Sequence, residues 1–522
     1  MTITSFAYLT FILVGGCIYY ILPKKMQWLE LLALSIVFYC VVANPYTLIF
    51  PIIATLLAYS STLLQQTESV KREKWKYTGC TIVTLAVILC VSLWFWLKAS
   101  DIWVSVSYRI SNIVSFVQPL SAPSVLAALG MGYYTLQIIG YILDCYWGTI
   151  QPQRNPLKLF LFVIFFPQMV TGPISRYSQL EGLFLPNEFS YENVTRGAQR
   201  ILWGFFKKLV LAERVGIIVN SIYGDLDLYN GWWHWIALLL YPIQMYADFS
   251  GCTDIVLGTA EVFGIQLPEN FNNPFFSRTS QEFWQRWHIT LGAWAKDYVL
   301  YPLLKTKWMV NFGKKAKKKF GKRFGKFIST AIGMFFLWMV MGIWHGSFKY
   351  IIGVSLWYWV ILMLGELFSP VFEKMVILLK VNTESFSWHL FQSMRTYLIY
   401  AIGAVFFRAD GFGQAIRFLK SLITMFIGGR IPNSWILFNG SILDFGVSYG
   451  DLNITIFAVA MLVIVAVLRE KYGYARSWMG KQILVFRWTV WIALFIIVLI
   501  LGSYGPGYNA SEFIYQGFQN EK

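Results

Sequence analysis

The stretch FFLWMVMGIWHG, residues 335–346, decides the fold class of this 522-residue chain. It closes an apolar run that begins near residue 327, and a helix needs about 20 apolar residues, at least about 17, to cross a bilayer. The run is therefore long enough to cross. It ends on His345, which lies between Gly342 and Gly346, and these glycines leave room for backbone or a ligand. Because an ionisable side chain at membrane depth is costly, His345 is a functional candidate by default.

Similar apolar runs recur along the whole chain. The clear candidates are 5–22, 28–43, 47–64, 79–97, 201–219, 232–249, 327–345, 350–368, 391–407, 453–468 and 487–503. The stretch 112–147 must hold at least one more, and 157–173 ends in Thr-Gly-Pro, which favours a re-entrant loop. We therefore predict an all-α polytopic membrane protein with about 10–12 transmembrane helices, plus re-entrant and interfacial helices.

The composition supports this class. Hydrophobic residues make up 57% of the chain and charged residues 13%, about half of the roughly 25% that is usual in soluble domains. Lys and Arg outnumber Asp and Glu by 43 to 26, but they lie between the apolar runs. This placement indicates an anionic lipid leaflet as partner, and not nucleic acid. The six cysteines form no CxxC pair, so we expect small buried hydrophobic residues, no metal site and no bound cofactor.

Charged loops orient the predicted helices, because cytoplasmic loops carry an excess of Lys and Arg. The basic segments, which we place in the cytoplasm, are 24–25, 71–76, 154–158, 305–326, 374–380 and 469–487. The segments without this excess, which we place outside, are 44–45, 225–227 and 444–451. Both termini then lie outside. Residues 305–326 carry ten Lys or Arg and no acid, which predicts a solvated loop near anionic lipid.

The region 250–326 is too polar to span a membrane, yet it is rich in aromatic residues. Within 278–304 the spacing predicts an interfacial helix capped by Ser280, and its apolar stripe is expected to pack. The stripe consists of Phe283, Trp284, Trp287, Leu291 and Trp294. The carboxylates at odds with their surroundings are Asp144, Asp248, Asp254, Glu269, Glu282 and Asp297. Arg278, Arg286 and Lys296 could pair with some of these carboxylates, mainly to fix the fold.

The chain has four histidines, His234, His288, His345 and His389, and each follows a tryptophan. His234 and His389 lie at predicted span edges, where amphipathic residues are common, so we expect structural roles for them. The imidazole of His345 can take a proton from a hydroxyl near neutral pH, or it can make a hydrogen bond that packs helices. His288 lies on the aromatic helix, where it fits either a second catalytic group or a positioning role.

Residues 245–302 contain the stretches MYADFSGCTD (245–254), LPENFNNPF (267–275), EFWQRWHITL (282–291) and KDY (296–298). These motifs resemble the membrane-bound O-acyltransferase (MBOAT) family. Further matches in the same order are FPQMVTGPISRY (166–177), GFFKK (204–208), GIWHG (342–346), VFFRA (405–409) and FIY (513–515). The pattern is most similar to the alginate O-acetyltransferase branch, which is related to the D-alanyl transferases of teichoic acid.

The resemblance implies a bowl of helices around a central tunnel that joins a cytoplasmic donor to an acceptor outside. It implies one membrane domain over 1–522, with N-terminal helices over 1–110, a motif-bearing core over 130–410 and C-terminal helices over 411–522. His345 would be the family's membrane-embedded catalytic histidine, and His288 its other characteristic histidine. The residues expected to bind substrate are Trp287, Asn270, Arg278 and Trp344. Lys296 departs from the family pattern, which usually has Arg there, and Lys lacks the planar fork of Arg.

The implied function is O-acyl transfer at the plasma membrane. The acyl group, acetyl in the first instance, would come from acetyl-CoA or another cytoplasmic thioester and move toward hydroxyls of a cell-surface polysaccharide. An extracytoplasmic SGNH-type partner would complete the delivery. One alternative is a D-alanyl transferase that acts on teichoic acid from a carrier-protein thioester. An alternative of another class is a proton-coupled transporter whose histidines relay protons.

Overall fold

The computed structural model describes residues 1–66, 76–98, 100–114, 118–121, 128–229, 231–427 and 445–504. These residues form helices and connecting turns, with no β-strand among them and one isolated bridge, between Phe271 and Trp287. The all-α class is confirmed. The predicted features at 71–75, at 444 and at 513–515 lie outside the described residues.

Eight helices of the described part are long and apolar enough to cross a membrane. They are Lys24–Val42, Pro45–Gln65, Thr78–Lys98, Lys307–Trp344, Phe348–Leu378, Phe386–Arg408, Tyr449–Tyr472 and Leu484–Leu501. The chain is therefore a multi-pass membrane protein. Three predicted runs fall outside these eight: 5–22 forms a helix of 16 residues, 201–219 is divided among three elements, and 232–249 belongs to a helix that continues to Val262.

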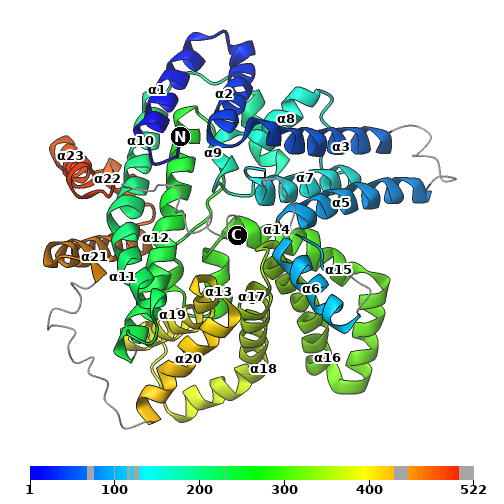
Figure 1. Cartoon of the computed structure of the whole chain (residues 1–522), viewed down its shortest axis with the longest axis vertical. Helices are drawn as coiled ribbons and strands as arrows, with labels where there is room; N and C mark the ends of the chain where they lie inside the picture. Colours follow the sequence, from blue (N-terminus) through cyan, green and yellow to red (C-terminus); the bar gives the residue numbers. More distant parts are fainter. Residues whose placement is uncertain are drawn as a thin grey trace. The chain divides into compact units, whose positions relative to one another are not determined.

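The first of two compact units contains residues 1–204 and 252–269. Its elements are α1 (Phe6–Ile21), η1 (Lys24–Met26), α2 (Gln27–Val42), η2 (Pro45–Leu48), α3 (Ile49–Gln65), α5 (Lys76–Lys98), α6 (Ser100–Ile113), α7 (Met131–Tyr146), α8 (Pro156–Ile164), α9 (Phe166–Met169), η4 (Tyr177–Phe184), α10 (Tyr191–Phe205) and the end of α12 (Trp232–Val262). Helix α7 is buried along most of its length, with α3 and α5 beside it (Figure 1).

The predicted re-entrant segment 157–173 forms α8 and α9, and a break at Phe165 separates the two helices. Helix α8 has nine residues, and nine residues of helix rise only about 14 Å, which is too short to cross a bilayer. Both helices are largely buried in protein. This burial fits the prediction, because non-spanning backbone at membrane depth needs protein or water around it.

The second unit contains residues 205–251 and the described residues from 270 onward. Its elements are η5 (Phe206–Ala212), α11 (Glu213–Gly224), the first part of α12, η6 (Pro274–Phe276), α13 (Ser280–Arg286), α14 (Ile289–Ala295), η7 (Lys296–Leu300), α15 (Tyr301–Lys305), α16 (Lys307–Trp344), α17 (Phe348–Tyr350), η8 (Ile351–Leu356), α18 (Trp357–Leu378), α19 (Phe386–Arg408), α20 (Phe412–Ile427), α21 (Tyr449–Tyr472), α22 (Ala475–Gly480) and α23 (Leu484–Leu501). Within it, η8 contacts α16, α18 and α19.

Helix α16 corrects the prediction of a solvated loop over 305–326. Gly321 has φ +82°, which interrupts the helix, and a Cβ atom on Gly325 would lie 2.4 Å from the backbone nitrogen of Lys317. The element therefore folds back on itself as a helical hairpin. Lysine is a good helix former, so a basic run is compatible with a helix as well as with a loop.

A close contact between η8 and α19 makes a testable prediction. A Cβ atom on Gly353 would lie 2.0 Å from Cγ of Phe406, so Gly353→Ala forces the ring to move. We expect a lower thermal unfolding temperature in detergent, since overpacking typically costs about 1–3 kcal/mol. Gly365→Ala in α18 is the control, because no atom lies within 4 Å of its added methyl group. Equal unfolding temperatures for the two variants would contradict this packing.

Candidate functional site

Five of the six predicted site residues lie together in the second unit: Asn270, Trp287, His288, Trp344 and His345. They come from the segment before η6, the α13–α14 junction and the end of α16. The sixth, Arg278, has an exposed side chain, and its backbone carbonyl accepts a hydrogen bond from Arg395 Nη2 at 2.7 Å. The structure therefore does not bring the Arg278 side chain to the others.

The predicted interfacial helix over 278–304 is broken at His288, which is a correction. His288 has φ +45° and ψ +52°, a left-handed conformation that is uncommon outside glycine and that often marks functional sites. Helix α13 is capped by Thr279, whose hydroxyl accepts from the Glu282 N–H, and not by the expected Ser280. Most of the aromatic stripe is buried in protein, so it packs as expected but does not lie on a membrane surface.

Asn270 orients His288. Its Oδ1 accepts hydrogen bonds from the backbone N–H of Thr290 at 3.2 Å and from the Thr290 hydroxyl at 2.9 Å, and it lies 3.1 Å from His288 Nδ1. Because an N–H group already bonds to Oδ1, this oxygen is an acceptor and His288 Nδ1 carries the proton. The Nε2 atom is then the unprotonated nitrogen, which accepts hydrogen bonds. The fully buried Asn270 thus acts on the imidazole, and substrate contact by Asn270 stays a prediction.

An aromatic shell surrounds Trp287. Its ring lies 5.1 Å from Phe271, 5.7 Å from Phe283 and 5.0 Å from Tyr400, measured between ring centroids. The Trp287 side chain is buried by these rings. Such contacts hold the segment before His288 in one position, while a direct contact with substrate remains untested.

His345 lies at the C-terminal end of α16, where aromatic rings enclose it. The centroid of its ring is 5.0 Å from that of Trp344, 5.6 Å from Tyr350 and 5.2 Å from Phe407. The Trp344 ring is also 6.2 Å from the His288 ring, so one indole lies beside both imidazoles. Both histidines are buried. Among the described residues, they are the two imidazoles that share an aromatic neighbour, Trp344.

The two glycines beside His345 shape the backbone. A Cβ atom on Gly342 would lie 1.8 Å from the Ser355 hydroxyl oxygen, so Gly342 allows α16 to approach η8. Gly346 has φ +88°, a conformation that L side chains rarely adopt, and it turns the chain after the helix. Of the two predicted uses of the room at Gly342, backbone or a ligand, the structure shows the protein itself, since Ser355 and the Tyr350 carbonyl lie there.

Lys349 is a buried cation near His345 that sequence reasoning did not single out. Its Nζ donates to the backbone carbonyl of Ala409 at 2.8 Å and lies 5.2 Å from the centre of the Tyr350 ring. Tyr350 also contacts His345, so Lys349 places positive charge in the same neighbourhood. Its signal in the sequence was a lysine that directly follows the deep apolar run.

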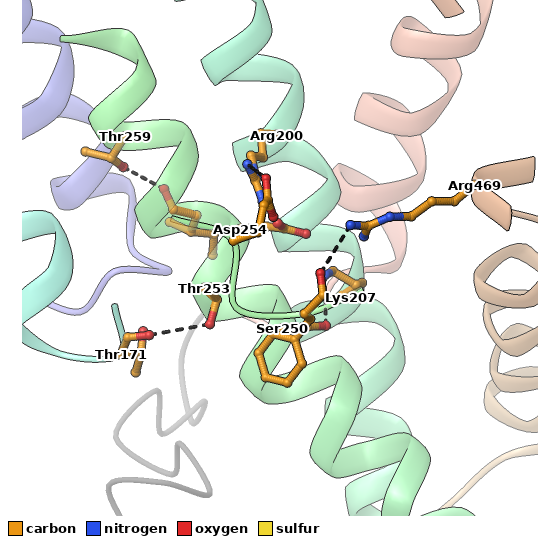
Figure 2. A network of polar contacts seen from close by, with 11 residues as sticks. Thr171, Arg200, Lys207, Ser250, Thr253, Asp254, Thr259 and Arg469 are labelled. Carbon is orange, nitrogen blue, oxygen red and sulfur yellow. Dashed lines mark hydrogen bonds and ion pairs between the residues drawn. The ribbon is translucent and has the colours of Figure 1, made fainter. Parts of the chain in front are cut away.

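Ion pairs account for most of the carboxylates that the sequence marked. In the first unit, Arg200 pairs with Asp254 at 2.9 Å and with Glu269 at 2.6 Å (Figure 2). In the second unit, Lys208 lies 2.9 Å from Asp248, and Arg286, one of the three predicted basic partners, pairs with Glu282 at 2.8 Å. Sequence reasoning missed Arg200 and Lys208, because the marked carboxylates that they meet, Asp254, Glu269 and Asp248, lie 40 or more residues later in the chain.

The remaining histidines fit structural roles. Nδ1 of the buried His234 makes a hydrogen bond with the Ser421 hydroxyl, and its ring lies 4.9 Å from Phe418. His389 lies partly exposed in the first turn of α19.

Comparisons with known proteins agree with these motifs. Residues 153–407 match the model of the membrane-bound O-acyltransferase family. The chain is 30% identical over 308 residues to "Probable alginate O-acetylase AlgI" of Pseudomonas syringae pv. tomato, covering 59% of this chain and 54% of that protein. It is 29% identical over 256 residues to the teichoic acid D-alanyltransferase of Bacillus subtilis, covering 46% and 59%. It is 27% identical over 326 residues to the peptidoglycan O-acetyltransferase of Helicobacter pylori, covering 57% and 57%. The chain thus spans a little more than half of the length of each of these relatives.

The hydrogen bonds of Asn270 predict a stability difference. Asn270→Ala leaves buried donors of His288 and Thr290 without their acceptor, which costs about 1–3 kcal/mol for each such group. We expect a clearly lower thermal unfolding temperature in detergent. The exposed Asn272 is the matched control, since only its backbone N–H makes a hydrogen bond, to Arg286 O. Similar unfolding temperatures for Asn270→Ala and Asn272→Ala would contradict the orienting role.

The burial of His288, which lies outside the eight candidate spans, predicts a pH dependence. Burial lowers the pKa of the His288 imidazole to about 3, and the charge of His345 also lowers it. The unfolded chain, with a pKa near 6.5, binds the proton first as pH falls, so stability is lost below pH 6.5 at up to about 1.4 kcal/mol per pH unit. We expect His288→Asn, which tolerates the left-handed backbone, to lose stability less steeply from pH 6.5 to 4. Parallel curves for this variant and the unmodified protein would refute the low pKa.

Proposed function

Because the chain belongs to the membrane-bound O-acyltransferase family, we propose that it is an O-acyltransferase that moves an acetyl group from a thioester toward hydroxyls of a cell-surface polysaccharide. The names of the similar proteins support this proposal, since two describe O-acetyl transfer, to alginate and to peptidoglycan. The observation that carries it is the pair of buried imidazoles, His288 and His345, which both contact the Trp344 ring.

His345 acts as the general base in this proposal. Its imidazole takes the proton of the acceptor hydroxyl as the hydroxyl oxygen attacks the thioester carbonyl carbon. A carbon–oxygen bond forms, the carbon–sulfur bond breaks, and the proton passes from the imidazole to the leaving thiolate. The rings of Trp344, Tyr350 and Phe407 exclude water, which slows hydrolysis of the thioester.

His288 holds a reactant in place. Its proton is fixed on Nδ1 by Asn270. The Nε2 atom therefore accepts a hydrogen bond from an N–H or O–H group of the thioester substrate or of the polymer that receives the acyl group. Its depressed pKa keeps the ring neutral at physiological pH, so His288 binds without competing for the proton that His345 takes.

The route of the acyl group follows from the chemistry of the two substrates. A thioester such as acetyl-CoA is cytosolic and too polar to cross a bilayer, whereas the polymer lies outside. The proposal therefore needs a passage to His345 from each face of the membrane, and a central tunnel would supply it. An extracytoplasmic SGNH-type partner completes the delivery.

D-alanyl transfer is the second candidate, and the similarity to the Bacillus subtilis teichoic acid D-alanyltransferase favours it. The attack on the thioester is the same, but the donor is a D-alanyl group on a carrier protein. Purified protein incubated separately with radiolabelled acetyl-CoA and with the D-alanyl carrier thioester distinguishes the two. Consumption of neither, together with proton flux in liposomes, would favour a proton-coupled transporter.

The proposal predicts the effect of removing His345. His345→Ala should reduce consumption of the thioester by the factor of about 10²–10⁴ that general base catalysis supplies, with expression and membrane insertion unchanged. His389→Ala is the control, because His389 also follows a tryptophan but lies partly exposed on α19. Transfer at the unmodified rate in the His345 variant would remove this residue from the mechanism.

A further inference from the structure

Two chain segments present the Asn270–His288 pair, and they are joined to one another. The Asn272 N–H donates to the Arg286 carbonyl at 2.9 Å, the Ile289 N–H donates to the Asn270 carbonyl at 3.0 Å, and the isolated bridge lies between these bonds. Each segment contains one residue with a left-handed backbone, Asn273 with φ +46° and His288 with φ +45°. Such conformations persist only where the surroundings hold them.

Helix α21 provides some of the contacts that stabilise these two segments. Ala466, Arg469 and Glu470 are spaced three and four residues apart, so they share one face of the helix. Arg469 Nη2 donates to the backbone carbonyl of Phe271 at 3.1 Å, and Figure 2 shows this side chain reaching the carbonyl. The Asn273 Nδ2 atom donates to the Ala466 carbonyl at 2.9 Å.

Glu470 connects both segments through one oxygen atom. Its Oε1 accepts from Asn273 Nδ2 at 3.1 Å and from Arg286 Nη1 at 2.6 Å. Arg286 also pairs with Glu282 of α13. The Arg286 and Glu470 side chains remain 23% and 33% exposed, so solvent weakens this ion pair as a source of stability. Its main consequence is geometric, because it fixes the spacing of the two segments.

We propose that α21 sets the orientation of His288 through the contacts of Arg469, Glu470 and Asn273. We call these three residues the α21 clamp. Helix α21 lies outside residues 153–407, so a part of the chain beyond the family match contributes to the site. Glu470 is a positioning residue: it acts through Asn273 and Arg286. The inference rests on the proposed function only in using acyl transfer as one of its two readouts.

The test compares variants of the full chain, purified in detergent, with acetyl-CoA as donor. Glu470→Ala should lower kcat about tenfold or more while KM for the thioester stays unchanged, since displacement of a catalytic group by about 1 Å can cost about 10²-fold. Glu470→Gln keeps an oxygen acceptor and should restore most of kcat. Glu384→Ala removes an exposed carboxylate before α19 and serves as the control.

Asn273→Gly is the second variant, for the case that Glu470→Ala does not fold. Glycine accepts the left-handed backbone but lacks the side chain that binds α21, so the same loss of kcat is expected. The second readout is the rate at which diethyl pyrocarbonate modifies His288, followed by mass spectrometry, which should rise in Asn273→Gly and Glu470→Ala. Unchanged kcat and unchanged modification would overturn the clamp. If the protein without substitutions consumes no thioester, but diethyl pyrocarbonate still modifies His288 faster in the variants, the result would count against the proposed function alone.

Discussion

A backbone amide inside a bilayer has no water with which to form a hydrogen bond. The helical structure of the described part of this protein follows from that constraint. Helices satisfy their own N–H and C=O groups, which is why the apolar segments are helical. Every break in a helix therefore needs another partner for the groups it releases. At the break before α14, the Asn270 side chain and carbonyl and the Asn272 N–H bond the released groups. The break and the candidate site are thus one structural feature.

Buried charge obeys a related constraint. Removing a carboxylate or a guanidinium from water is expensive, and the cost is recovered only when partners are close and well oriented. Arg200, half-buried in the first unit, meets two carboxylates, and the buried Lys208 in the second unit meets Asp248 and Glu213. Loss of one partner would leave an uncompensated buried charge, so these clusters fix helix positions and do not need a role in chemistry.

Local features were predictable from the sequence, and long-range ones were not. Apolar length alone identified the eight long apolar helices and placed His345 at the end of α16. The stripe from Phe283 to Trp294 has continuous helical spacing, so nothing local indicated the break at His288. That break depends on Asn270, which is 18 residues earlier, and on α21, which begins at Tyr449. The family motifs included Asn270 and His288 but could not indicate that their contact is a hydrogen bond.

The two histidines of the candidate site differ in what holds them, and the difference suits different tasks. Hydrogen bonds fix the His288 ring and its proton, and burial keeps it neutral, so it cannot store a proton at physiological pH. Aromatic rings enclose His345, with the Trp344, Tyr350 and Phe407 centroids 5.0, 5.6 and 5.2 Å from the centroid of the imidazole. A base must gain and then release a proton within each cycle, whereas a binding group must not change charge. In the acyl transfer that we propose, His345 is the base, and the fixed ring of His288 aims the reactant at it.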